Sequence, residues 1–265
     1  MDDSTTRGTD WDEYSATIAR RKNSDEWAVL RTAREQHYDR FFSVNPGERV
    51  LDAGCGHGEY TMFALQRGAR VWAIDFSPAM LSYTEQACGA AGLQAESFTR
   101  QSVMDIQYPD DHFDVVYCLS VLECIEDPDL ALRELLRVLK PGGRLYLDVC
   151  NALAVHWRFL FLCLQKLGAA PKGEMRYFRP GELKTMVRNA GGMPTRDCGQ
   201  AFSPPFSGLY TADLRRYTIF PDWLIRPLDA AYLWLEKVTN HLWPFRTICW
   251  HYFLEVRKPD GKGGV

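Results

Sequence analysis

The chain has 265 residues, of which 46% are hydrophobic and 25% charged, and its formal net charge is -3. This length suits one α/β domain with a full core plus additions. The absence of a basic excess argues against a nucleic-acid binder. Eight cysteines are scattered without CxxC pairs, which argues against both disulfides and a zinc site.

The first 45 residues carry helical signals. Apolar residues recur at helical spacing within 26–42, which predicts a helix with one apolar face. The acidic, polar start has no apolar segment of the kind that marks a secretory signal. We therefore expect a helical lid at 1–45 and a cytoplasmic protein.

From Pro46 onward, short apolar runs alternate with helical segments, which is the pattern of a parallel sheet. A helix and strand follow in 180–202, and 248–258 supplies a final strand, so that seven strands are expected. The first five strands are predicted at 49–53, 69–75, 95–101, 113–119 and 143–150.

Two predicted helices have clear start signals. Ser77-Pro78 and Asp127-Pro128 each place a capping side chain before a proline at the first helical position. The second of these helices carries a leucine stripe that extends to Leu139, and Pro141-Gly142-Gly143 predicts its end.

Residues 50–61 read VLDAGCGHGEYT and place a glycine-rich turn after the first strand. The spacing is GxGxG, whereas the dinucleotide fingerprint is GxGxxG. Asp52 before the turn would repel a pyrophosphate and suits an amine. Asp75 ends the next strand, where an acid can accept both ribose hydroxyls, and Phe76 can flank a purine. The predicted ligand has a cation, a ribose and a base, with no need for phosphate.

Four segments, VLDAGCGHGEYT, VWAIDFSPAML, FDVVYCLSVLECIEDP and LRELLRVLKPGGRLYL, resemble in this order the class I S-adenosylmethionine-dependent methyltransferases. Within them, the resemblance is to the quinone-biosynthesis and natural-product branch. It covers residues 46–150. It implies S-adenosyl-L-methionine as the cofactor and a Rossmann-like, mostly parallel seven-stranded sheet with helices on both faces. An N-terminal helical lid and a C-terminal aromatic-rich helical cap complete the expected α/β fold.

The resemblance also implies roles for individual residues. Asp52 would organise the loop and orient the methionine amine, Asp75 would hold the ribose, and Phe76 would pack on adenine. Ser102 stands where the family commonly has an acid, with Asp105 three residues on, and Cys124 stands where a histidine is common. The other cofactor-binding residues that the resemblance implies are Gly54, Cys55, Gly56, Val103 and Leu119.

Methyl transfer from a sulfonium mainly requires alignment of the nucleophile with the methyl carbon and sulfur. A base is needed only if the acceptor starts protonated. The candidates are His156, just after the fifth strand, and Tyr14, on the leader. An imidazole titrates near neutrality, which favours His156. A packing role is the alternative for both, and no metal is expected.

The predicted organisation has a lid at 1–45, a core at 46–202 with a cap segment at 151–179, a helical insert at 203–247 and the final core strand at 248–258. Five of the eight tryptophans lie beyond residue 150. They either fill a core or line a pocket for an apolar acceptor. The apolar run at 152–167 is too short to span a membrane, and a weak peripheral membrane contact through it stays open.

The function predicted is methyl transfer from S-adenosylmethionine to an O or C atom of a hydrophobic small molecule, which is aromatic, polyketide, isoprenoid or lipid-like. One alternative is a non-methylating homologue that binds the cofactor and acts as a scaffold or cyclase. A dinucleotide-dependent oxidoreductase is the other, and both the GxGxG spacing and Asp52 argue against it. The expected partner is the acceptor alone, without nucleic acid, and the chain is expected to be a monomer or homodimer.

Overall fold

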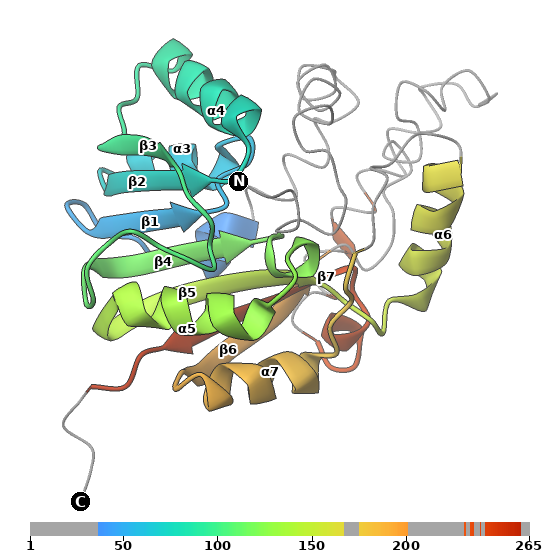
Figure 1. The fold of residues 1–265 in the computed structure, drawn as a ribbon. Helices are drawn as coiled ribbons and strands as arrows, with labels where there is room; N and C mark the ends of the chain where they lie inside the picture. Colours follow the sequence, from blue (N-terminus) through green and yellow to red (C-terminus); the bar gives the residue numbers. More distant parts are fainter. Residues whose placement is uncertain are drawn as a thin grey trace, which may run out of the picture.

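The computed structural model describes residues 37–166, 175–200 and 242–260, together with 231, 234, 235 and 239. Within these ranges, seven strands form one sheet in the order β3-β2-β1-β4-β5-β7-β6 (Figure 1). The strands are β1 (Arg49–Ala53), β2 (Arg70–Asp75), β3 (Ser97–Arg100), β4 (Phe113–Leu119), β5 (Leu139–Cys150), β6 (Met193–Gln200) and β7 (His251–Arg257).

The sheet is mostly parallel, as predicted. Strands β1 to β5 pair in parallel, whereas β7 lies antiparallel between β5 and β6. Because β7 runs against its neighbours, its first residue lies at the edge of the sheet where β4 and β5 end.

Helices cover both faces of the sheet (Figure 1). On one face, Leu51 and Val116 of the strands pack with Leu135 and Val187 of two helices. On the other face, neighbouring strand residues pack against the segment 37–42 and the helix that follows β1. The helices are α3 (Glu59–Gln66), α4 (Pro78–Ala90), α5 (Pro128–Val138), α6 (Val155–Lys166) and α7 (Pro180–Asn189), with 3-10 turns η3 (Leu122–Cys124) and η5 (Phe245–Thr247).

Both predicted helix starts are confirmed. The backbone N–H of Met80 donates to Oγ of Ser77 at 3.1 Å, and that of Leu130 donates to Oδ1 of Asp127 at 2.9 Å. Each bond satisfies a donor that the first helical turn leaves unpaired. The two caps fix where α4 and α5 begin, directly after β2 and just after the turn that follows β4.

The predicted end of α5 is wrong. The helix stops at Val138, because Leu139 has extended dihedrals and pairs with Phe113 of β4. Leu139 therefore belongs to the sheet, and Pro141-Gly142-Gly143 lies within β5. The predicted strands at 69–75 and 95–101 are also shorter, at 70–75 and 97–100.

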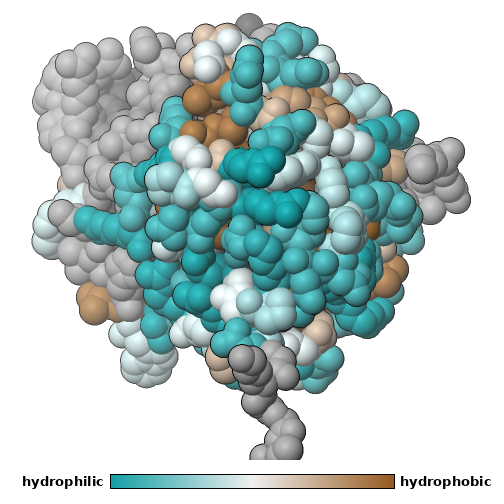
Figure 2. All heavy atoms as spheres, turned by 90° about the vertical axis from the view of Figure 1, so that its left-hand side faces the viewer, coloured by the Kyte–Doolittle hydropathy of each residue, from teal (hydrophilic) through white to brown (hydrophobic). Residues whose placement is uncertain are grey.

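Figure 2 shows the side of the molecule from which β1, β2 and β4 start, and that side is largely hydrophilic. The opposite edge of the sheet, where these strands end, carries the glycine turn and the predicted site residues. None of the described helices has both the length and the apolar character that a bilayer crossing requires. Most of the predicted lid, most of the insert at 203–247 and part of the cap segment at 151–179 lie outside the described residues.

Candidate cofactor and acceptor site

The glycine turn after β1 is held by the neighbouring strand. The backbone N–H groups of Gly54 and Cys55 both donate to the carbonyl of Ile74, at 2.8 and 2.9 Å. Gly54, Gly56 and Gly58 all have left-handed φ angles, of +89°, +50° and +73°. Such angles favour glycine over any residue with a Cβ, which explains why all three positions are glycine.

The three glycines differ in what surrounds them. A Cβ on Gly54 would lie 2.3 Å from Cγ2 of Val121, and one on Gly58 would lie 2.6 Å from Cγ2 of Thr84. At Gly56, a Cβ would meet no atom of the described chain within 4 Å. Gly54 and Gly58 are therefore required by packing. The bare backbone of Gly56 faces open space, which is what close approach by a ligand requires.

Asp52 lies behind the turn rather than on its surface. Its side chain is buried, and its Oδ2 accepts a hydrogen bond from the Thr61 hydroxyl of α3 at 2.6 Å. Burial raises the pKa of Asp52 to about 7, and the charge of Asp75 adds to this, while the bond from Thr61 opposes it. Asp52 thus joins β1 to α3, and its role in cofactor binding stays a prediction.

Asp75 joins the glycine turn to the start of α4. Its Oδ2 accepts the backbone N–H of Gly56 and its Oδ1 accepts that of Ser77, both at 2.9 Å. Contact of this carboxylate with the ribose hydroxyls stays a prediction. Next to it, the Phe76 ring lies under the guanidinium of Arg100, 5.1 Å from the ring centroid. The sequence analysis did not identify Arg100.

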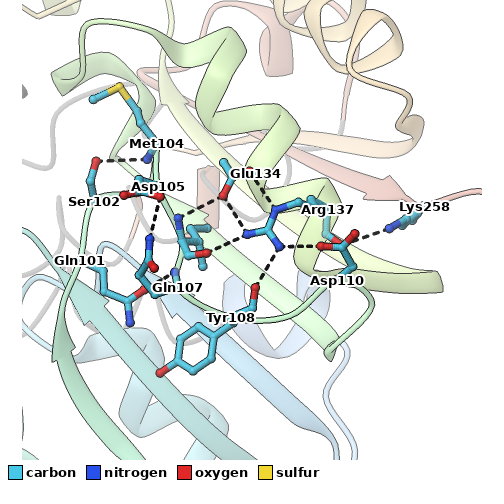
Figure 3. A network of polar contacts seen from close by, with 11 residues as sticks. Gln101, Ser102, Met104, Asp105, Gln107, Tyr108, Asp110, Glu134, Arg137 and Lys258 are labelled. Carbon is cyan, nitrogen blue, oxygen red and sulfur yellow. Dashed lines mark hydrogen bonds and ion pairs between the residues drawn. The ribbon is translucent and has the colours of Figure 1, made fainter.

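The loop after β3 carries Ser102 and Val103, which were predicted to lie at the adenine edge. Oγ of Ser102 accepts the backbone N–H of Met104 at 3.2 Å, and Val103 is buried. Asp105 points into the loop itself, where its Oδ1 accepts from Gln107 at 2.7 Å (Figure 3). The hydroxyl of Ser102 can still donate its own proton, and its contact with adenine stays a prediction.

Arg137 of α5 holds this loop in place through several hydrogen bonds (Figure 3). It donates to the carbonyls of Ile106 and Tyr108, at 2.7 and 2.9 Å, and to the carboxylates of Glu134 and Asp110. Glu134 in turn accepts the backbone N–H of Ile106 at 3.1 Å. The conformation of the loop after β3 therefore depends on its contacts with α5.

The structure brings Asp52, the glycine turn, Asp75, Phe76 and the 102–103 loop to the ends of β1, β2 and β3. The open backbone at Gly56, flanked by two acids at strand ends, fits an amino-acid nucleoside such as S-adenosylmethionine. Leu119 is buried at the end of β4. Tyr14 lies outside the described residues. His156 lies in α6, and its side chain is outside them too, so both catalytic assignments stay predictions.

A second polar group, which the sequence analysis missed, lies at the ends of β4 and β5. It consists of Ser120, Glu123, Asp148 and His251. Glu123 and Asp148 are both buried. Burial and the charge of Asp148 raise the pKa of Glu123 to about 8. An aspartate within the apolar run LYLDVC was the available signal, because fully buried strands seldom carry an unpaired acid.

Comparison with known proteins places this geometry in a family. Residues 51–147 match the model of the family described as "Methyltransferase domain". The chain is 30% identical over 177 residues to a ubiquinone biosynthesis O-methyltransferase of Stutzerimonas stutzeri, covering 60% of this chain and 75% of that protein. It is 34% identical over 151 residues to the protein of the same name from Xanthomonas euvesicatoria, covering 55% of this chain but only 62% of that relative. The match thus spans about three fifths of the Xanthomonas protein.

Solved structures agree on the fold. A Thermotoga maritima S-adenosylmethionine-dependent methyltransferase has a TM-score of 0.62 at 16% identity, covering 94% of this chain and 98% of that one. The [4+2]-cyclase SpnF has a TM-score of 0.58 at 20% identity, covering 97% and 87%. The sheet order, the glycine turn and these relatives together show that the chain belongs to the class I S-adenosylmethionine-dependent methyltransferases.

Proposed function

We propose that this protein transfers the methyl group of S-adenosylmethionine to an oxygen atom of a hydrophobic small molecule, with carbon methylation as the other form of the same chemistry. The observation that carries the proposal is the open backbone at Gly56 between Asp52 and Asp75. A cationic ligand suits two nearby acids, and methyl transfer follows from the sulfonium that such a ligand supplies. The ubiquinone biosynthesis O-methyltransferases among the relatives favour oxygen as the acceptor atom.

Aromatic side chains near the last residue of β5 and the first residue of β7 support a hydrophobic acceptor. The rings of Trp157 and Trp250 stack with centroids 5.6 Å apart, and Tyr177 lies 5.8 Å from Trp250. Arg158 lies over the Tyr177 ring at 4.8 Å. Flat apolar surfaces with one nearby cation suit an aromatic acceptor that carries a polar group. Trp223, one of the five tryptophans beyond residue 150, lies outside the described residues.

The cofactor part is tested by calorimetry with S-adenosylmethionine and S-adenosylhomocysteine. We expect the wild type to bind both and Asp75→Ala to lose at least about tenfold in affinity, or 1.4 kcal/mol. Asp129→Ala, at an exposed position of α5, is the matched control and should bind as the wild type does. A wild type that binds neither compound would contradict the proposal.

The acceptor part is tested with cofactor labelled in the methyl group. The acceptors offered are a catechol, a hydroquinone with an isoprenoid chain and a long-chain fatty acid. Label should enter the two phenolic compounds. Cofactor binding without transfer to any acceptor in a cell extract would favour the scaffold or cyclase alternative. Two observations support that alternative: Cys124 stands in place of the family's histidine, and the fold is similar to that of a cyclase.

Contact of α6 with a membrane surface stays a prediction. Val155, Phe159 and Leu162 of this helix are exposed, and apolar side chains on one helix can enter the interface of a bilayer. Flotation with anionic vesicles tests it, and a protein that stays at the bottom of the gradient would exclude it.

A further inference from the structure

The polar group at the ends of β4 and β5 is built around one buried carboxylate, that of Asp148. Oγ of Ser120 donates to its Oδ2 at 2.7 Å, and the backbone N–H of Ser120 donates to the Asp148 carbonyl at 3.0 Å. Ser120 has a φ of +57°, which is strained for a residue with a side chain. The strained backbone aims the hydroxyl at Asp148, and such strain is frequent at functional sites.

The second partner of Asp148 is His251. Nδ1 of His251 lies 3.1 Å from Oδ1 and 3.0 Å from Oδ2 of the carboxylate. An ionised carboxylate can only accept hydrogen bonds, so in the neutral imidazole this contact requires the proton on Nδ1 and leaves the lone pair on Nε2. The described residues provide no hydrogen-bond partner for Nε2. The imidazole side chain is 16% exposed, so it lies at the boundary between the core and the space beyond the strand ends.

The antiparallel direction of β7 places this imidazole at the ligand edge. His251 is the first residue of β7 and pairs with Cys150, the last residue of β5. Ser120 directly follows β4, and its neighbour Val121 packs against Gly54 of the glycine turn. Asp148 therefore connects the turn that is expected to hold the methionine part of the cofactor with an imidazole further along the same edge.

We propose that His251, oriented by Asp148 and Ser120, is the base that accepts the proton of the acceptor's hydroxyl group. This inference rests on the proposed function. Nε2 takes the hydroxyl proton while an oxygen lone pair forms the bond to the methyl carbon. The bond between that carbon and the sulfur breaks, and its electrons stay on the sulfur. The imidazolium, balanced by Asp148, then releases the proton to solvent.

This assignment accounts for the cysteine at position 124. Cys124 is buried, and a neutral thiol is a poor proton acceptor. With a histidine absent there, the imidazole reaches the same edge of the sheet from β7. A base at His251 is useful only for an acceptor whose nucleophilic oxygen starts protonated, such as a phenol or an enol. A carboxylate acceptor is already ionised and needs no base.

Nuclear magnetic resonance of the imidazole nitrogens tests the assignment without any acceptor. The chain has six histidines, and the spectrum of His251→Asn identifies the resonances of His251. We expect neutral His251 to carry its proton on Nδ1 in the wild type. Asp148→Asn offers an amide that can donate to Nδ1, so the proton should move to Nε2 in that variant. A wild-type His251 with its proton on Nε2 would overturn the proposal.

Kinetics with two acceptors provide the second test. A nitrocatechol is largely ionised at pH 8 and needs no base, whereas the parent catechol is not ionised. We expect His251→Asn to lower kcat roughly 10²–10⁴-fold on catechol and less than about tenfold on the nitrocatechol. His112→Asn, next to the start of β4 on the opposite edge of the sheet, should leave both rates unchanged. Equal losses on the two acceptors would overturn the proposal, because a structural role predicts them.

The pH profile supplies the third readout. Asp148 contacts His251 directly, and Cys150 pairs with it in the sheet. The charge of Asp148 also acts on Glu123 and on the thiol of Cys198. We expect kcat on catechol to rise with pH, because a general base must start unprotonated, and the rise to be absent on the nitrocatechol. If the wild type binds the cofactor but methylates neither compound, the proposed function fails for hydroxyl acceptors, while the nitrogen spectra still decide the state of His251.

Discussion

Replacing Gly56 by alanine separates the cofactor role of the glycine turn from its structural role. The φ of Gly56 is +50°, and an alanine there costs about 1–2 kcal/mol because its Cβ approaches the following carbonyl oxygen. A Cβ at this position meets no atom of the described chain within 4 Å, so no steric cost is added. We therefore expect Gly56→Ala to fold with a modest loss of stability.

The new methyl group would occupy the space in which the cofactor is expected to lie. Favourable contact between two carbon atoms needs roughly 3.5–4 Å, so a ligand packed on the bare backbone must move away. We expect the affinity for S-adenosylhomocysteine to fall at least about tenfold, which corresponds to 1.4 kcal/mol. Urea denaturation and calorimetry measure the two effects on the same preparation.

Gly92→Ala is the matched control. Gly92 also has a left-handed φ, of +69°, and a Cβ there meets no described atom within 4 Å, but it follows the end of α4, away from the turn. Both variants should lose similar stability, and only Gly56→Ala should lose affinity. If Gly56→Ala binds S-adenosylhomocysteine as tightly as Gly92→Ala does, the backbone of Gly56 does not contact the cofactor and the reasoning is refuted.

Three further predictions concern stability in urea. The pKa of Glu123 is raised in the folded state, so its contribution to stability falls as the pH rises from 4.5 to about 8. Glu123→Gln should therefore be more stable than the wild type at pH 8.5, and its advantage should be smaller at pH 5. An equal effect of the substitution at both pH values would contradict this prediction. Thr61→Val removes the hydroxyl that donates to Asp52 and should lower the stability by about 1–3 kcal/mol. The loss should be larger at pH 8.5 than at pH 5, because the pKa of Asp52 is about 7 and the ionised carboxylate depends more on this donor. Arg137→Met should cost about 2 kcal/mol through the carbonyls it leaves unpaired, whereas the exposed Arg133→Met should change stability by less than about 0.5 kcal/mol.

Local signals predicted the fold well where one residue type has one physical role. Ser77 and Asp127 cap helices because their oxygens accept backbone N–H bonds, and this depends on few neighbours. The three glycines of the turn were recognisable for the same reason. The error at Leu139 arose because a leucine suits a helix stripe and a buried strand equally well. Its pairing with Phe113, which decides between the two, is a contact that spacing does not reveal.

The residues expected on the cofactor side lie in short, ordered motifs, which is why the sequence alone suggests them. The residues proposed for the acceptor side, Ser120, Asp148 and His251, have no such motif, because they come from three strand ends that the chain order separates by up to 131 positions, from 120 to 251. Only the antiparallel insertion of β7 brings the last of them to the first two. A side chain recruited by tertiary pairing has no signature in the local sequence.

The order of the strands also determines how the sheet ends. Among the strands that the structure describes, the two outer ones are β3, with four residues, and β6, which begins Met193-Pro194 and shifts register between Pro194 and Arg196. Short length, a proline and an irregular register all hinder pairing with another chain along an open edge. A second copy would therefore meet this protein through helices or loops, and the sheet should not grow by adding strands from a neighbour even at high protein concentration.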